Sequence, residues 1–326
     1  MPNSISVARR LATQAIHFVI GVLLIGTLVM TPPAISGEET ASIYGGGGVF
    51  LDIGGKFGGW AHSVSGGSMQ GESYSSPTII SQSGEAVRDL DITFGMDMAP
   101  VWWAWINQVL GKNPGRTQDM AVIRTDFEGR QIDRIVLREA RIKRIAFPLF
   151  DGAGKEPILF TVRMSAASSK QERTTPQIAP PRSKLRFPLN NAFGFELGGL
   201  PMQRTHRVVP PLVTIEFGRS RIGTSRTQAP AAPIVNIGNM TVNVPMRDYD
   251  FIRDWVDAFI LGQATQDNLT QARLSVLSPD FKQVIMTIDF DRVGPVRFQP
   301  TAVDSSSNKI MTAELELHIE QVRITF

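Results

Sequence analysis

Val49-Phe50-Leu51-Asp52-Ile53-Gly54-Gly55 is a strand-like apolar segment that ends in two glycines, and it decides how the rest of the chain is interpreted. A similar segment, Phe193-Gly194-Phe195-Glu196-Leu197-Gly198-Gly199, follows at an offset of 198 − 54 = 144 residues. The 326-residue chain is long enough for about two domains, each with its own core. We therefore interpret it as two related halves.

Further matching segments follow in each half. The alternating segment Asp91–Met96 corresponds to Thr241–Met246, at an offset of 246 − 96 = 150. Asp126-Phe127 is echoed by Asp280-Phe281, at an offset of 280 − 126 = 154. The offsets drift only from 144 to 154, and the order of the elements is kept. The pattern therefore predicts an internal duplication of a mainly β domain with one helix.

Each half contains one amphipathic helical segment. In the first half, apolar residues recur at i, i+3, i+4, i+7 and i+8, and these are Trp102, Trp105, Ile106, Val109 and Leu110. In the second half, the matching stripe is Ile252, Trp255, Val256 and Phe259. Each half is therefore expected to place one helix against its strands.

Composition divides the chain into four parts. From Ala166 to Lys184 the chain is rich in Ser, Thr and Pro with mixed charge, which is typical of a linker. The predicted parts are an N-terminal segment (1–45), a first β domain (46–168), a linker (169–186) and a second β domain (187–326).

The N-terminal segment differs in character from the rest. Arg9 and Arg10 precede an apolar run from Ala15 to Met30, which ends before Pro32-Pro33. A basic flank and a short apolar region are typical of an export signal, and an uncleaved membrane anchor fits as well. The alternative is a core helix or a tail that packs on a partner subunit.

Residue usage excludes several kinds of chemistry. The chain has no cysteine, which excludes disulfides, cysteine-based metal sites and a cysteine nucleophile. Its four histidines lack ligand spacing, and a net charge of +3 is too small to indicate specific nucleic-acid recognition. The glycines before Lys56 do not match a phosphate-binding loop, and Ser68 lacks the last glycine of a nucleophile elbow. We expect a protein that is not an enzyme and uses no metal or cofactor.

Two long excursions are predicted to be irregular interaction segments, with a disordered loop as the alternative for each. The first, Lys56 to about Val87, is dense in Gly and Ser, and the second includes Arg219 to Pro233. Trp103 points away from the apolar stripe of its helix, which makes it a candidate contact with a neighbouring subunit. The candidate inter-subunit contacts are Trp103, Gly66, Gly67, Ser68, Met69, Gln70, Arg219, Arg221 and Arg226.

The first half resembles the phage tail-tube protein family, which contractile phage tails and extracellular injection particles share. The resemblance lies in Phe50–Gly55, Ser65–Gln70, Asp91–Met96, the Trp-rich helix and Ile145–Asp151. It implies a β-sandwich or rolled barrel with one flanking helix. It also implies that six such domains close a ring around a β-lined channel. In the second half the likeness rests mainly on the duplication.

The resemblance implies a structural role in a phage tail-like particle. A chain with two such domains would form the ring as a trimer with pseudo-sixfold symmetry, or as a hexamer, in a tube, tube-end or adaptor layer. Its partners would be copies of itself, adjacent tube or baseplate and hub proteins, and a membrane if residues 15–30 act as an anchor. The alternative is an exported or membrane-anchored ligand-binding β protein, with Trp103 and the Gly/Ser segment as its site.

Overall fold

A computed structural model describes residues 47–67, 69–76, 79–87, 89–172, 177–181, 188–218, 232–262, 269–301 and 311–326 of the chain. The predicted N-terminal segment, with its apolar run at residues 15–30, lies outside these ranges. In the part of the chain that is described, no helix is long and apolar enough to cross a membrane.

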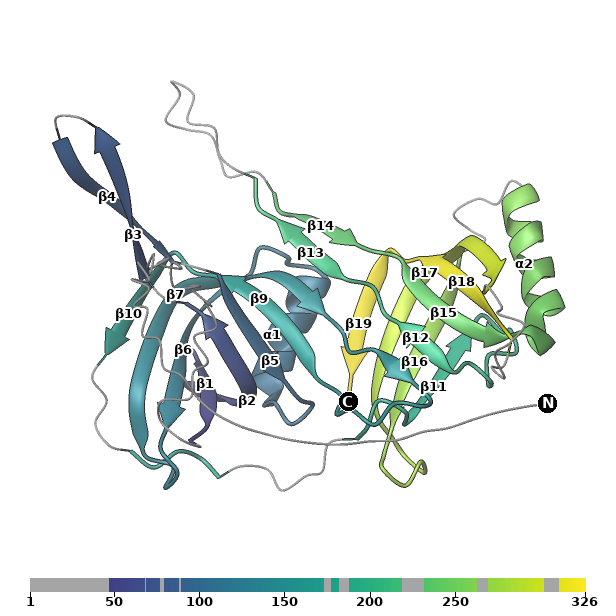
Figure 1. The fold of residues 1–326 in the computed structure, drawn as a ribbon, viewed down its shortest axis with the longest axis horizontal. Coiled ribbons are helices and arrows are strands. Elements are labelled where there is room, and N and C mark those ends of the chain that lie inside the picture. The colour runs from purple at the N-terminus through teal and green to yellow at the C-terminus, as the bar shows by residue number, and fades with distance from the viewer. Residues whose placement is uncertain are drawn as a thin grey trace, which may run out of the picture. The chain divides into compact units, whose positions relative to one another are not determined.

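The first half forms a closed, antiparallel barrel-like sheet (Figure 1). Going around it, the strands follow the order β7-β6-β1-β2-β5-β9, and β9 pairs back with β7. Their bounds are β1 Val49–Ile53, β2 Lys56–Gly66, β5 Leu90–Phe94, β6 Thr117–Thr125, β7 Gln131–Ala146 and β9 Phe160–Ser165. Helix α1 (Pro100–Leu110) follows β5, and the short strand β10 (Ser168–Glu172) pairs with β7.

The second half forms a similar sheet with the order β11-β16-β17-β18-β15-β12-β8, and β19 also pairs with β17. The strands are β8 Phe150–Asp151, β11 Phe193–Leu197, β12 Arg207–Val209, β15 Met240–Pro245, β16 Thr270–Leu277, β17 Val284–Pro300, β18 Thr312–His318 and β19 Gln321–Thr325. A 3-10 turn, η1 (Met246–Asp248), leads into α2 (Tyr249–Leu261). Within the described ranges β11 and β12 are not paired, so this sheet is open between them. The predicted fold class, mainly β with two barrel-like sheets and a helix in each half, is confirmed.

Strand registers repeat between the halves at a nearly constant offset. The pair Arg144↔Arg163 corresponds to Arg297↔Glu316, since 297 − 144 and 316 − 163 both equal 153. A register shift precedes each pair at the same place on β7 and β17. The pairs between β1 and β6 recur between β11 and β16, with Val49↔Arg124 matched by Phe193↔Val276. The two halves therefore share residue-level pairing as well as the order of their strands.

The first excursion is largely regular, so the prediction of an irregular segment there is wrong. Residues 56–66 form β2, and residues 69–76 and 79–87 form the hairpin strands β3 (Met69–Ser76) and β4 (Ile79–Val87). Glycine does not prevent β2 from pairing with β1 and β5, and Gly59 is required there. Its φ is +117°, and a Cβ would lie 2.8 Å from Cα of Met98.

The predicted linker begins inside a strand, because residues 168–172 form β10 at the edge of the first sheet. Its side chains are all polar and most are exposed, which suits a short edge strand, and a polar composition of this kind also predicts a linker. Residues 177–181 also lie on the first half. Ala179 is buried with Phe50 and Ile123, and its N–H donates to the carbonyl oxygen of Gly129 over 2.7 Å.

Candidate assembly interface

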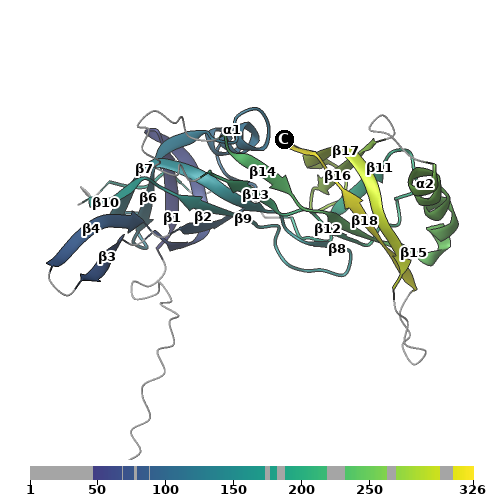
Figure 2. The same cartoon turned by 90° about the horizontal axis from the view of Figure 1, so that it is seen from above.

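A hairpin of the second half extends the sheet of the first half. Strand β13 (Val213–Glu216) pairs with β14 (Ile234–Ile237) and also with β7, through Val213↔Ile145 and Thr214↔Arg144. At these two positions β9 occupies one edge of β7, so β13 takes the other. Figures 1 and 2 show β13 and β14 beside the strands of the first half. This is β-strand addition between two barrel-like sheets within one chain.

The first half contributes a strand in return. Phe150 and Asp151, in β8, pair with Val208 and Arg207 of β12. Phe150 is buried, and its ring centroid lies 5.6 Å from that of Phe193. Backbone hydrogen bonds therefore join the halves at two sheet edges, where unpaired strands would otherwise favour self-association.

Helix α1 forms a third connection, with the C-terminal strand. The Asn107 side chain donates to the carbonyl oxygen of Ile324 over 2.7 Å, and the Ile324 N–H donates back to Asn107 Oδ1 over 3.0 Å. One turn earlier, the ring of Trp103 lies 4.7 Å from that of Phe326. One flank of α1, at Trp103 and Asn107, is therefore covered by the second half, while Ala104 and Gln108 stay exposed.

Trp103 is consequently a core residue. It is 5% exposed and contacts Phe94 and Phe160 of its own barrel as well as Phe326. The prediction that it points away from the core toward another subunit is wrong, because two surfaces cover α1 from different sides. Periodicity identifies only the first of these surfaces.

Asn107 provides a direct test of this connection. Asn107→Ala is expected to lower the free energy of unfolding by about 1–3 kcal/mol, because it leaves both backbone groups of a partly buried Ile324 without a partner. Gln108→Ala, at the exposed neighbouring position of the same helix, is the matched control and should change stability by less than about 0.5 kcal/mol. Urea unfolding would measure both. Equal effects of the two substitutions would contradict the role given to Asn107.

The predicted contact residues of the first excursion lie at the base of the β3–β4 hairpin. Gly66 and Gly67 have φ of +85° and +74°, so they turn the chain from β2 toward β3. Met69 and Gln70 begin β3 and pair with Val87 and Ala86 of β4. The remaining candidates, Ser68, Arg219, Arg221 and Arg226, lie outside the described residues.

Gly66 also tolerates no side chain. A Cβ there would lie 2.1 Å from the carbonyl oxygen of Asp89, whereas Gly55, with a φ of +81°, has open space around it. Gly66→Ala is expected to destabilise the chain by at least about 1–3 kcal/mol more than Gly55→Ala, since both substitutions share the backbone strain and only one adds an overlap. Thermal unfolding of the two variants measures the difference. Equal melting temperatures would show that the hairpin base is not held as described.

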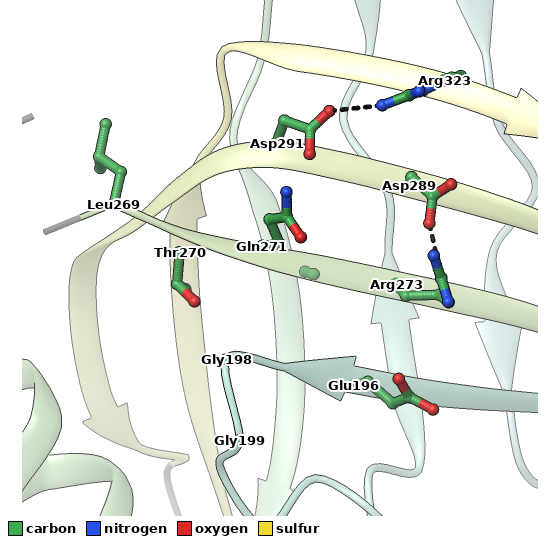
Figure 3. A pocket seen from close by; sticks show the side chains of 11 residues that line it. Glu196, Gly198, Gly199, Leu269, Thr270, Gln271, Arg273, Asp289, Asp291 and Arg323 are labelled. Atoms are coloured by element: carbon green, nitrogen blue, oxygen red, sulfur yellow. Dashed lines mark hydrogen bonds and ion pairs between the residues drawn. The ribbon is translucent and has the colours of Figure 1, made fainter. Parts of the chain in front are cut away.

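A polar hollow of about 780 Å³ opens on the second half, over strands β11, β16, β17 and β19. Figure 3 shows its charged side chains in a row of alternating sign, which consists of Glu196, Arg273, Asp289 and Arg323. Arg273 is hydrogen-bonded to Asp289 over 2.7 Å, and this bond raises the pKa of Arg273. Arg323 pairs with Asp291 over 3.0 Å. These two ion pairs join four of the five charged side chains that line the hollow, and the fifth, Glu196, lies on the neighbouring strand β11.

The described part of the chain contains no group of three His, Asp or Glu side chains that could hold a metal ion. No pattern in the sequence indicates the contacts between β13 and β7 or between Asn107 and Ile324. Val213-Thr214-Ile215-Glu216 does alternate like a strand, but alternation does not identify the partner strand.

Comparison with models of known protein families and with curated protein sequences found no match. Three solved structures of injection or prophage particles resemble part of the chain. The baseplate structure of the anti-feeding prophage has a chain 20% identical, with a TM-score of 0.31, covering 41% of this chain and 90% of that one. A chain of the cap of the same particle is 17% identical, with a TM-score of 0.34, and the match covers 41% of this chain and 87% of that one. The sheath/tube terminator of an extracellular contractile injection system, PVC, has a chain that is 17% identical, with a TM-score of 0.33. The match covers 46% of this chain and all of that one.

Proposed function

We propose that this chain is a structural subunit that builds rings in a phage tail-like, contractile injection particle, and that its two halves arose by duplication of a tail-tube-like domain. The observation that carries the proposal is the pairing of β13 with β7, in which one half adds a strand to the sheet edge of the other. The repeated registers of the halves support the duplication.

Two equivalent halves with one such joint between them provide a rule for assembly. The joint between the halves is head-to-tail, because it uses a different surface on each half. Repetition of a head-to-tail contact generates a closed ring when the rotation from each half to the next adds up to a full turn. Three chains would supply six equivalent halves. The sequence resemblance to tail-tube proteins favours this closed arrangement, in a tube, tube-end or adaptor layer.

The ligand-binding alternative has no support of its own. Trp103, its proposed platform, is 5% exposed, and four of the five charged side chains of the polar hollow form two ion pairs.

Electron microscopy of the purified full chain tests the proposal. Negative-stain images should show rings, and native mass spectrometry should give a multiple of the 35.8 kDa chain. A monodisperse monomer at high concentration would contradict it.

A further inference from the structure

The β3–β4 hairpin of the first half is the counterpart of the β13–β14 hairpin of the second. Each lies between equivalent strands, β2 and β5 in the first half and β12 and β15 in the second. The pair Met69↔Val87 corresponds to Val213↔Ile237, with offsets of 213 − 69 = 144 and 237 − 87 = 150. These are the offsets of the flanking strands, since Val64↔Ile92 corresponds to Val208↔Val242.

The two hairpins differ in what they contact. Val213 and Thr214 of β13 pair with Ile145 and Arg144 of the other half. In the described structure β3 and β4 form a two-stranded sheet of their own, and neither pairs with a further strand. The β13–β14 hairpin therefore pairs with the other half of its own chain, whereas the β3–β4 hairpin pairs with no other strand of the described ranges.

The acceptor edge also has an unused counterpart. Adding 153 to Arg144 and Ile145 gives Arg297 and Phe298 of β17. These two residues pair with Glu316 and Leu315 of β18 on one edge, as Arg144 and Ile145 pair with β9. Their other edge, which β13 occupies on β7, is not paired with any strand of the described ranges.

We infer that β3 of one copy of this chain adds to the free edge of β17 in a second copy, with Gln70 opposite Arg297 and Met69 opposite Phe298. This inference rests on the proposed function and deepens it by naming the joint between subunits. The occupant is a second copy because the joint repeats, position for position, the contact that the chain makes between its own halves. Repetition of the contact would unite three chains through alternating internal and external joints of one kind.

The contact between α1 and β19 also has a counterpart that two copies of the chain could form, between α2 and β10. The side of α1 that binds β19 within the chain has its counterpart on α2, where Arg253 and Asp257 replace Trp103 and Asn107 at an offset of 150. Arg253 and Asp257 have side-chain exposures of 57% and 50%, unlike buried Trp103. The counterpart of β19 is β10, where Lys170 is 78% exposed. Arg253 and Asp257 pair with each other over 3.4 Å, so this side of α2 is polar and exposed, as is the β10 surface at Lys170.

Cysteine pairs in the full chain test the joint, because the natural chain has no cysteine. Directly opposed residues of antiparallel strands have Cα atoms about 4.5–5.5 Å apart, within the range of a disulfide. The double variant Gln70→Cys/Arg297→Cys is expected to form intermolecular disulfides, seen on non-reducing gels as covalent dimers and trimers. The matched pair Arg144→Cys/Thr214→Cys should form the same bond inside one chain and run as a monomer.

Two controls define the specificity. Each single-cysteine variant, and Gln70→Cys combined with Val284→Cys at the far end of β17, should give at most a tenth of the cross-linked product. If rings form but the Gln70/Arg297 pair does not cross-link between chains while the Arg144/Thr214 pair closes, the inference is overturned and the proposed function stands. If the native chain forms no ring, both fail. A Gln70–Arg297 disulfide within a monomer would also overturn the inference.

Discussion

Replacing Trp103 with alanine is expected to lower the free energy of unfolding by about 3–5 kcal/mol. The side chain is 5% exposed and contacts two rings of the first barrel and Phe326 of the second half. Its removal leaves a cavity at the place where α1, the first sheet and the C-terminal strand meet. Because whole domains are stable by only about 5–15 kcal/mol, this loss is a large part of the total.

Denaturant unfolding, followed by tryptophan fluorescence and circular dichroism, measures this effect. Phe127→Ala is the matched control, because it also removes an aromatic ring but at a position that is 75% exposed. Its effect should stay within about 0.5 kcal/mol. If the Trp103→Ala protein were as stable as the control, Trp103 would not belong to the core. The prediction that it contacts a neighbouring subunit would then be supported again.

Replacing residues 69–87 with a short Gly/Ser linker is expected to abolish assembly and to leave a folded monomer. The hairpin pairs only with itself among the described strands, so its removal leaves the sheet β2-β5 intact. The linker has little distance to span, since Gly66 pairs directly with Leu90 across the hairpin base. Without β3, the joint proposed between copies loses its donor strand.

Analytical ultracentrifugation gives the oligomeric state of this variant, and circular dichroism shows whether it is folded. The control carries the same linker inserted at the exposed turn Phe281-Lys282, which lies away from both hairpins in the sequence. The control should assemble like the natural chain. If the shortened variant still formed oligomers of the natural size, β3 would not be the strand that joins the copies.

The sequence predicted the elements that have a local pattern. Alternation located strands β5 and β15, and the apolar stripes located α1 and α2 within a few residues. The matching segments at offsets of 144 and 150, β1 with β11 and β5 with β15, also pair alike, since β1–β6 corresponds to β11–β16 and β5–β9 corresponds to β15–β18. Such features depend on residues close together in the chain and on their repetition, and both can be counted in a sequence.

The contacts between the halves were not predictable in this way. Val213 pairs with Ile145, 68 residues earlier, and no local period specifies a partner at that separation. Trp103 was misjudged because an apolar stripe marks the first surface that covers a helix, and here the C-terminal strand of the second half covers one further flank of α1. The β2–β4 region was predicted to be irregular because Gly and Ser weaken strand propensity, although pairing on both sides of β2 overrides that weakness.

A cryo-electron microscopy reconstruction of the assembled full chain is the most direct test of the central claim that both halves form joints of one kind. We expect a ring of three chains in which β3 meets β17 between neighbours as β13 meets β7 within each chain, so that the six halves follow a pseudo-sixfold arrangement. A two-fold dimer, or a ring whose subunits meet through surfaces other than the β17 edge and the β3–β4 hairpin, would contradict the claim.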